Sequence, residues 1–183
     1  MSTCLRYTPT VHITDRFLQH CKKLWLAWGG QGSEHARRED KYGDFERQIV
    51  LLGPNNSQRT AQIVCFRRAS KNSPRKEPTI RLLSDGFDIT VSASDFFQAL
   101  CGIRDQLAAH GFFPLCYGAS RNVYPSGMLR DMAEGISAYR LTIGKAVSIE
   151  DLVNIFETGP DLEVSTVAAQ KAFWDAWLVS RRH

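Results

Sequence analysis

Two pairs of strand-like segments, each joined by a short turn, constrain the fold of this chain more than any other feature. The four segments are rich in Val, Ile and Leu and span residues 46–52, 60–67, 79–83 and 87–91. The turn sequence GPNNSQ separates the first two, and Ser84-Asp85-Gly86 separates the last two. An Asp-Gly pair between alternating apolar segments is typical of a tight hairpin turn. The sequence therefore predicts two antiparallel hairpins, joined by loop 71–78.

Helical periodicity accounts for much of the remaining chain. The clearest helix begins with Ser94 as its cap, has the apolar stripe Phe96, Leu100, Ile103 and Leu107, and ends before Gly111. Further helices are predicted at 14–28, within 126–134, from a capping-box-like Ser148–Asp151 to the Gly159-Pro160 pair, and at about 166–179. Two more strands are predicted at 112–117 and 138–143.

Strand pairs followed by helices indicate an α+β fold. We expect one domain spanning 1–183, with an antiparallel or mixed sheet of about six strands, namely two hairpins plus two later strands, covered by about four helices. The residues expected in the core lie on apolar stripes or runs: Phe96, Leu100, Ile103, Leu107, Leu115 and Trp174.

Composition excludes several classes of protein. The 43% apolar and 23% charged residues are ordinary for a globular protein, and no run of 18 apolar residues predicts a membrane span. The first residues lack the build of a signal peptide, and five widely spaced cysteines fit reduced thiols, so a cytoplasmic location is expected. The sequence has no C-x-x-C or H-E-x-x-H motif, so no metal site is predicted. Cys65, Cys101 and Cys116 lie in apolar runs and are expected in the core.

Charge is distributed unevenly along the chain. Residues 1–91 hold 15 Lys and Arg against 9 Asp and Glu, whereas residues 92–183 hold 8 against 10. We interpret the excess of basic residues in the first half as a solvated surface. The alternative is that these residues form a surface that binds nucleic acid. Its basic residues would be Arg67, Arg68, Lys71, Arg75 and Lys76. No aromatic residue lies within that cluster to stack on bases, so only weak, salt-sensitive binding of nucleic acid is expected.

No complete catalytic motif is present. Gly29-Gly30-Gln31-Gly32 lacks the Gly-Lys-Ser/Thr ending of a phosphate-binding loop, and the segment 118–122 has Asn where a nucleophile elbow needs its second Gly. Ser126 is better explained as a helix N-cap. We therefore predict no catalytic residue and no cofactor. An enzyme acting on a small molecule, with Glu134 as base and its site in loop 117–134, remains an alternative.

The stretch 112–144 is the candidate for specific contacts, because it places polar residues on short connections between two predicted strands. Tyr and Arg anchor many protein interfaces. The candidate partner-binding residues in this stretch are Tyr117, Arg121, Asn122, Tyr124 and Arg130. They are otherwise ordinary loop residues, with Arg130 pairing locally with Asp131 or Glu134. Glu157, Asp161 and Glu163 join them because 146–170 contains five acids and no Lys or Arg, which suits a basic partner.

The segment YGASRNVYPSGMLRDMAEGISAYRLTIGK, followed by SIEDLVNIFETGPDLE and the last Trp-bearing helix, resembles immunity proteins encoded beside bacterial polymorphic toxins, including those of type VI secretion. The resemblance covers roughly 94–180 and is one of general build. It implies a stand-alone cytosolic α+β protein, not an enzyme, that binds and neutralises a cognate toxin domain. These families share no catalytic residues, so none is transferred. The oligomeric state and the toxin's activity are not predicted.

Overall fold

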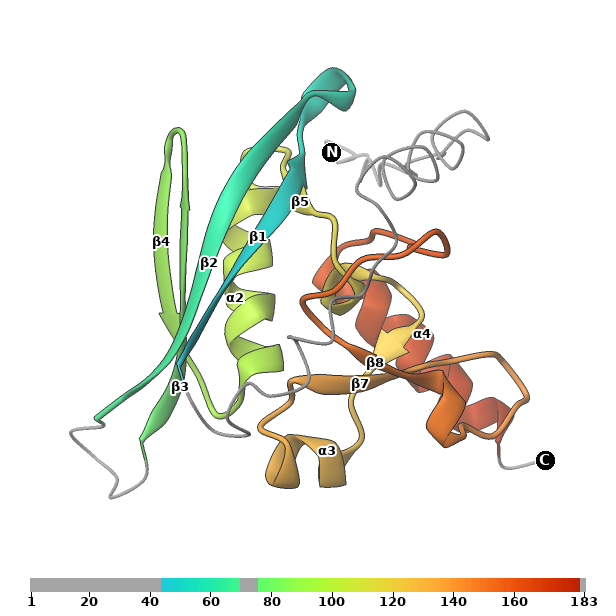
Figure 1. Cartoon of the computed structure of the whole chain (residues 1–183). Coiled ribbons are helices and arrows are strands. Elements are labelled where there is room, and N and C mark those ends of the chain that lie inside the picture. Colours follow the sequence, from blue (N-terminus) through green and yellow to red (C-terminus); the bar gives the residue numbers. More distant parts are fainter. Residues whose placement is uncertain (1–43, 70–75, 182–183) are drawn as a thin grey trace, which may run out of the picture.

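The computed structural model describes residues 44–69 and 76–181, which form an α+β fold (Figure 1). Within them lie a five-stranded sheet, a three-stranded sheet and three α-helices. The predicted helix at 14–28, most of the loop that follows it, and most of the basic loop 71–78 fall outside the described residues. The prediction of one domain across 1–183 stays a prediction.

Every strand pair in the large sheet is antiparallel, and the strand order is β4-β3-β2-β1-β5. The strands are β1 Phe45–Leu52, β2 Gln58–Arg68, β3 Glu77–Ser84, β4 Phe87–Ser92 and β5 Phe113–Pro114. The two predicted hairpins are confirmed. Side chains alternate between a buried and an open face, as with Ile49 and Leu51 against the exposed Gln48.

The turns explain the registers of the hairpins. Gly86 has φ +84°, a conformation that glycine adopts without strain, and it follows Asp85 between β3 and β4. Between β1 and β2, Asn55 and Asn56 also have positive φ, at 56° and 58°. Asn tolerates this region better than other non-glycine residues, which is why the GPNNSQ sequence turns here.

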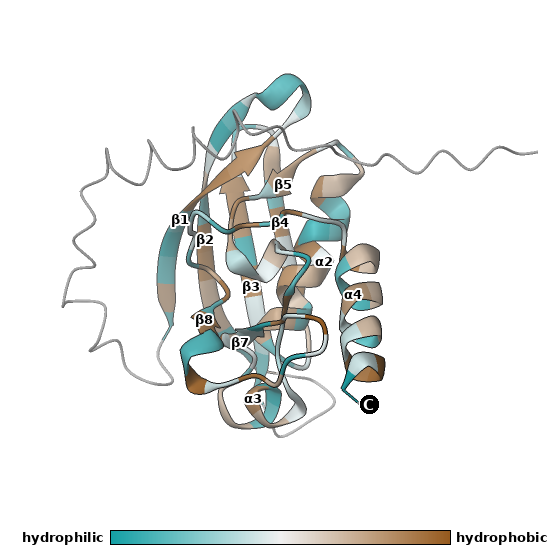
Figure 2. Ribbon diagram, turned by 90° about the vertical axis from the view of Figure 1, so that its right-hand side faces the viewer, coloured by the Kyte–Doolittle hydropathy of each residue, from teal (hydrophilic) through white to brown (hydrophobic). Residues whose placement is uncertain are grey.

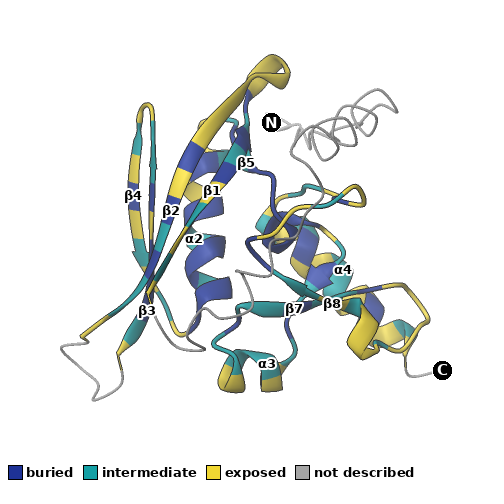
Figure 3. Ribbon diagram, in the orientation of Figure 1, coloured by how far each residue is buried: buried dark blue, intermediate teal, exposed yellow. Residues whose placement is uncertain are grey.

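Helix α2 (Phe96–Ala108) packs against the buried face of the large sheet and separates it from the described elements that follow β5 (Figure 1). Most of its length is buried, as the dark blue colour in Figure 3 shows. The predicted stripe Phe96, Leu100, Ile103 and Leu107 is fully buried. The N-cap is Asp95 rather than Ser94, because the Asp95 carboxylate accepts a hydrogen bond from the Gln98 amide at 2.8 Å.

The remaining elements lie on the other side of α2, in front of the large sheet in Figure 2. A small antiparallel sheet has the order β6-β7-β8 and is flanked by two helices. The elements are the 3₁₀ turn η3 Tyr117–Ala119, β6 Val123–Tyr124, α3 Gly127–Met132, β7 Ser137–Arg140, the 3₁₀ turn η4 Ile149–Asp151, β8 Leu152–Asn154 and α4 Val167–Ser180. Ser126 caps α3 as predicted, accepting a hydrogen bond from the Leu129 amide.

Several predictions about this half of the fold were wrong. The helix expected after Ser148 does not form: its capping box closes only the turn η4, and the chain then pairs with β7 as β8. Within residues 44–69 and 76–181, eight strands form two sheets, where about six strands in one sheet were expected. The strand predicted at 112–117 is reduced to two residues because it meets only the end of β1. Trp174 is only partly buried, whereas Trp177, three residues later on α4, is buried.

The other predicted core residues are confirmed, since Phe96, Leu100, Ile103, Leu107 and Leu115 are all buried. Cys65, Cys101 and Cys116 are buried free thiols, also as predicted. Among the described helices, none combines the length and apolar character that crossing a membrane requires.

Candidate functional site

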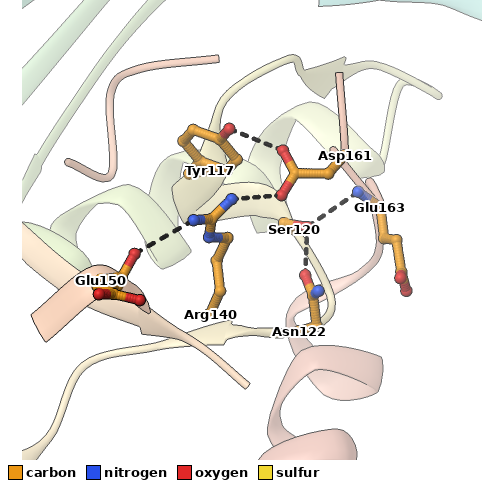
Figure 4. A network of polar contacts seen from close by, with 7 residues as sticks. All are labelled: Tyr117, Ser120, Asn122, Arg140, Glu150, Asp161 and Glu163. Carbon is orange, nitrogen blue, oxygen red and sulfur yellow. Dashed lines mark hydrogen bonds and ion pairs between the residues drawn. The ribbon is translucent and has the colours of Figure 1, made fainter. Parts of the chain in front are cut away.

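Asp161 is the centre of a polar network that joins four separate segments of the chain (Figure 4). The hydroxyl of Tyr117, at the start of η3, donates to Asp161 Oδ1 at 2.8 Å. Arg140, at the end of β7, donates from Nη1 to Asp161 Oδ2 at 2.7 Å and from Nη2 to the Glu150 carbonyl at 3.3 Å. The network therefore fixes the loop before α4 and the turn η4 against the small sheet.

The network shifts the pKa values of its members. Burial raises the pKa of Tyr117 to about 12, and the hydrogen bond to Asp161 adds to the shift. Burial alone would raise the pKa of Asp161, but hydrogen bonds from Tyr117 and Arg140 outweigh it and hold that pKa below its ordinary value. Asp161 is therefore ionised and Tyr117 neutral at neutral pH.

Main-chain contacts bring Tyr117 to this position. Its amide donates to the Glu157 carbonyl at 2.7 Å, and the next amide, of Gly118, donates to Ile155 O at 2.8 Å. The Tyr117 hydroxyl then occupies space above Gly159: a Cβ at Gly159 would lie 1.8 Å from it. The glycine of the Gly159-Pro160 pair, which the sequence suggested as a helix stop, instead makes room for the Tyr117–Asp161 hydrogen bond.

A second polar cluster lies beside the first and uses the other predicted residues of these loops. The buried hydroxyl of Ser120 donates to Asn122 Oδ1 at 2.8 Å and accepts from the Glu163 amide at 2.9 Å. The Arg121 side chain pairs with Glu163 at 3.2 Å, with both groups about half exposed, and lies over the Phe173 ring. The Ser120 hydroxyl proton is therefore used in the hydrogen bond to Asn122, and the Arg121 guanidinium is used in the ion pair with Glu163.

The structure therefore brings together five of the predicted residues in one place: Tyr117, Arg121, Asn122, Asp161 and Glu163. Glu157 lies next to them. It is exposed, its main-chain carbonyl accepts from Tyr117, and its charge contributes to the raised pKa of Tyr117. The loops predicted to hold separate contact residues are hydrogen-bonded to one another.

Tyr124 and Arg130 lie elsewhere. The Tyr124 ring is stacked on Trp174, with centroids 4.8 Å apart, and meets Phe97 edge-on at 5.1 Å. Its role in the structure is thus to join α4 to α2.

The expected local pairing of Arg130 was wrong. Its guanidinium donates to Asp95 at 2.7 Å, which ties α3 to the N-cap of α2. Glu134 instead pairs with Arg67 of β2, whose Nε lies 3.0 and 3.1 Å from the two carboxylate oxygens. To act as a general base, Glu134 would first have to leave this ion pair.

Arg104 and Gln170 are buried polar residues that no sequence pattern had indicated as part of the site. Arg104 is 3% exposed, and it donates to Gly118 O at 2.9 Å, to Ser165 O at 2.9 Å and to Gln170 Oε1 at 2.5 Å. The Gln170 amide nitrogen lies within hydrogen-bond distance of three main-chain carbonyls, those of Gly118, Ser120 and Val123. Burial lowers the pKa of Arg104. Through these buried hydrogen bonds, Arg104 and Gln170 hold loop 117–122 and the chain at Ser165 in position.

Helical spacing could have identified Arg104. It lies four residues after Leu100 and seven after Phe97, so this spacing places it within the buried arc of α2. Arginine is almost never fully buried unless paired, which is why such a position is ordinarily interpreted as exposed.

Two hollows on the described surface are lined by residues outside the network. One lies on the open face of the large sheet, lined by Gln48, Thr60, Ala61, Gln62, Leu83, Ser84 and Asp85. The other lies between the ends of α2 and α3, lined by Ser94, Asp95, Gly127, Arg130 and Asp131. The described residues contain no group of three His, Cys, Asp or Glu side chains arranged to hold a metal ion.

No protein-family model matches the sequence, and no curated protein is similar to it.

Proposed function

We propose that this chain is an immunity protein, which binds a cognate bacterial toxin domain through protein–protein contact and thereby neutralises it. The observation that carries the proposal is the convergence of loops 117–122, 148–152 and 157–163 on one hydrogen-bonded frame. We call these three loops the acidic face. Because their conformation is fixed before binding, little conformational entropy is lost when a partner docks.

The charges of this face favour a basic partner. Arg121 and Arg140 are already paired with Glu163 and Asp161, so they cannot contribute net positive charge. Glu150 and Glu157 are exposed, and the sequence from 146 to 170 contains no Lys or Arg. Toxins that act on nucleic acids present basic surfaces, and an acidic face suits such a partner.

Two contacts weigh against the alternatives. An enzyme that uses Glu134 as base would have to break the ion pair with Arg67. The nucleic-acid surface predicted in the basic half of the chain includes that same Arg67, whose charge is matched by Glu134. Each alternative therefore depends on a side chain that is already engaged in the Arg67–Glu134 ion pair.

The test is co-expression in a sensitive host with the toxin domain encoded by the neighbouring reading frame. Wild-type protein should restore growth, and the double variant Glu150→Gln/Glu157→Gln should restore it less well. The matched control is Glu46→Gln/Asp88→Asn, which also removes two exposed acids but from the large sheet. A wild type that neither restores growth nor forms a complex with the toxin would overturn the proposal.

A further inference from the structure

Ile149 is the most exposed large apolar residue in the described part of the chain. Its side chain is 85% exposed, although the sequence pattern predicted it on the buried face of a helix. It lies at the start of the turn η4, which directly precedes β8. A 3₁₀ turn has three residues per turn, so Leu152, which is 38% exposed, lies on the same side. We call these two residues the apolar knob.

The knob is displayed on a rigid turn. Ser148 donates to Asp151 Oδ2 from its amide at 2.8 Å and from its hydroxyl at 3.1 Å. The Asp151 amide donates back to the Ser148 carbonyl at 3.2 Å. Arg140 holds the Glu150 carbonyl from the other side, and Leu152 pairs with Tyr139 in the small sheet. A single exposed isoleucine needs no explanation, but one held on both sides by hydrogen bonds is preorganised for binding.

The surroundings of the knob specify the chemistry of its partner. Glu150 is exposed beside Ile149, and Asp151 follows it. A second exposed apolar pair, Met128 and Met132 on α3, has one residue of each sign between its members, Arg130 and Asp131. The two residues between Ile149 and Leu152 are both acids, and Arg140, which contacts the Glu150 carbonyl, is paired with Asp161.

We infer that Ile149 is the anchor of the acidic face and inserts into an apolar pocket, rimmed by Lys or Arg, on the partner protein. The inference rests on the proposed function and adds to it the residue that dominates affinity. In this arrangement the Tyr117–Asp161–Arg140 network supports the turn, and the contact itself is made by the knob and the exposed Glu150. Anchors of this kind are surrounded by neighbours that exclude water and contribute little themselves.

The test is calorimetric titration of purified full-length protein with the toxin domain of the neighbouring reading frame, inactivated at its catalytic site. Ile149→Ala should weaken binding about thirtyfold or more, as expected for an anchor. The control Met132→Ala removes a side chain that is 68% exposed on α3 and should leave affinity unchanged. Both variants should keep the wild-type melting temperature, because neither side chain is buried.

The outcomes separate the two proposals. If the wild type binds and Ile149→Ala binds equally well, the anchor is assigned wrongly while the proposed function stands. If the wild type does not bind the toxin domain, the proposed function fails, and the anchor with it. Loss of binding by Met132→Ala as large as that by Ile149→Ala would also overturn the assignment, since the knob would then have no special role.

Discussion

Arg104 and Gln170, 66 residues apart in sequence, hydrogen-bond each other at 2.5 Å in the buried space between α2 and α4. Within the described part of the chain, no carboxylate forms an ion pair with Arg104, and its cation is solvated by carbonyl oxygens and one amide. This arrangement satisfies the main-chain carbonyls of a segment that has almost no regular secondary structure. It is therefore the interaction that fixes loop 117–122 relative to α2.

Removing the Arg104 guanidinium should be strongly destabilising. Arg104→Met leaves Ser165 O and Gln170 Oε1 without this donor, while Gly118 O keeps the Gln170 amide as a donor. An unsatisfied buried group costs about 1–3 kcal/mol. We expect the free energy of unfolding, measured by urea denaturation, to fall by about 3 kcal/mol or more. The control Arg121→Met breaks a half-exposed ion pair and should cost less than about 1 kcal/mol. Equal losses in the two variants would contradict the role given to Arg104.

Tyr117 should make stability depend on alkaline pH. Its pKa is raised to about 12 in the folded protein, against about 10 in an unfolded chain. The folded state then binds more protons between these values, so its stabilising effect is complete below pH of about 10 and is lost as the pH rises towards about 12. The free energy of unfolding of the wild type should fall more steeply in this window than that of Tyr117→Phe. Parallel curves would show that the hydroxyl is not held as described.

A methyl group at Gly159 should disturb the same contact. Its Cβ would lie 1.8 Å from the Tyr117 hydroxyl, so Gly159→Ala must displace the tyrosine from Asp161. Overpacking of this kind costs about 1–3 kcal/mol. Gly127→Ala is the matched control, because a Cβ there meets nothing within 4 Å, and it should be neutral or slightly stabilising. A Gly159→Ala variant as stable as wild type would mean that the loop around Gly159 shifts at almost no cost in free energy.

The cysteines should behave as buried reduced thiols. Burial raises the pKa of Cys116 to about 11 and also raises that of Cys65, so little thiolate is present at neutral pH. A thiol reagent should therefore modify these two slowly in the folded protein, as peptide mass mapping would show. After denaturation without reductant, all five cysteines of the chain should react. Fewer than five reactive thiols would indicate a disulfide.

The large sheet and α2 could be predicted from the sequence because their signals are local. Each hairpin carries its own turn residues, and α2 has a long apolar stripe with Gly111 at its end, where φ is +74°. These patterns do not depend on distant residues, so a single sequence contains them fully.

In the small sheet only β7, Ser137–Arg140, was predicted, as part of the strand expected at 138–143. The other two strands, of two and three residues, are too short to give a sequence signal. A capping box is also present at Ser148, as predicted, but it specifies only the start of a helical turn. The conformation after that turn is decided by the pairing of Leu152 with Tyr139, a contact between residues 13 positions apart. Periodicity therefore assigned Ile149 to a buried face that does not exist.

The candidate site was predicted in part. Tyr and Arg in loop 117–122 and the acids of 157–163 were selected as contact residues, and the structure brings them together. The sequence did not indicate that these groups pair with one another, since the pairing depends on Gly159 and on the buried Arg104. Because these side chains pair with one another, we expect the partner protein to contact Ile149 and Glu150 instead.

Amide hydrogen exchange of the complex with the toxin domain tests the central claim most directly, because it locates the binding surface without any substitution. We predict that protection on binding is greatest at 148–152 and 157–163, and that the β1–β2 hairpin and the open face of the large sheet exchange as in the free protein. Protection confined to the large sheet, with 148–163 unchanged, would contradict the proposed binding surface.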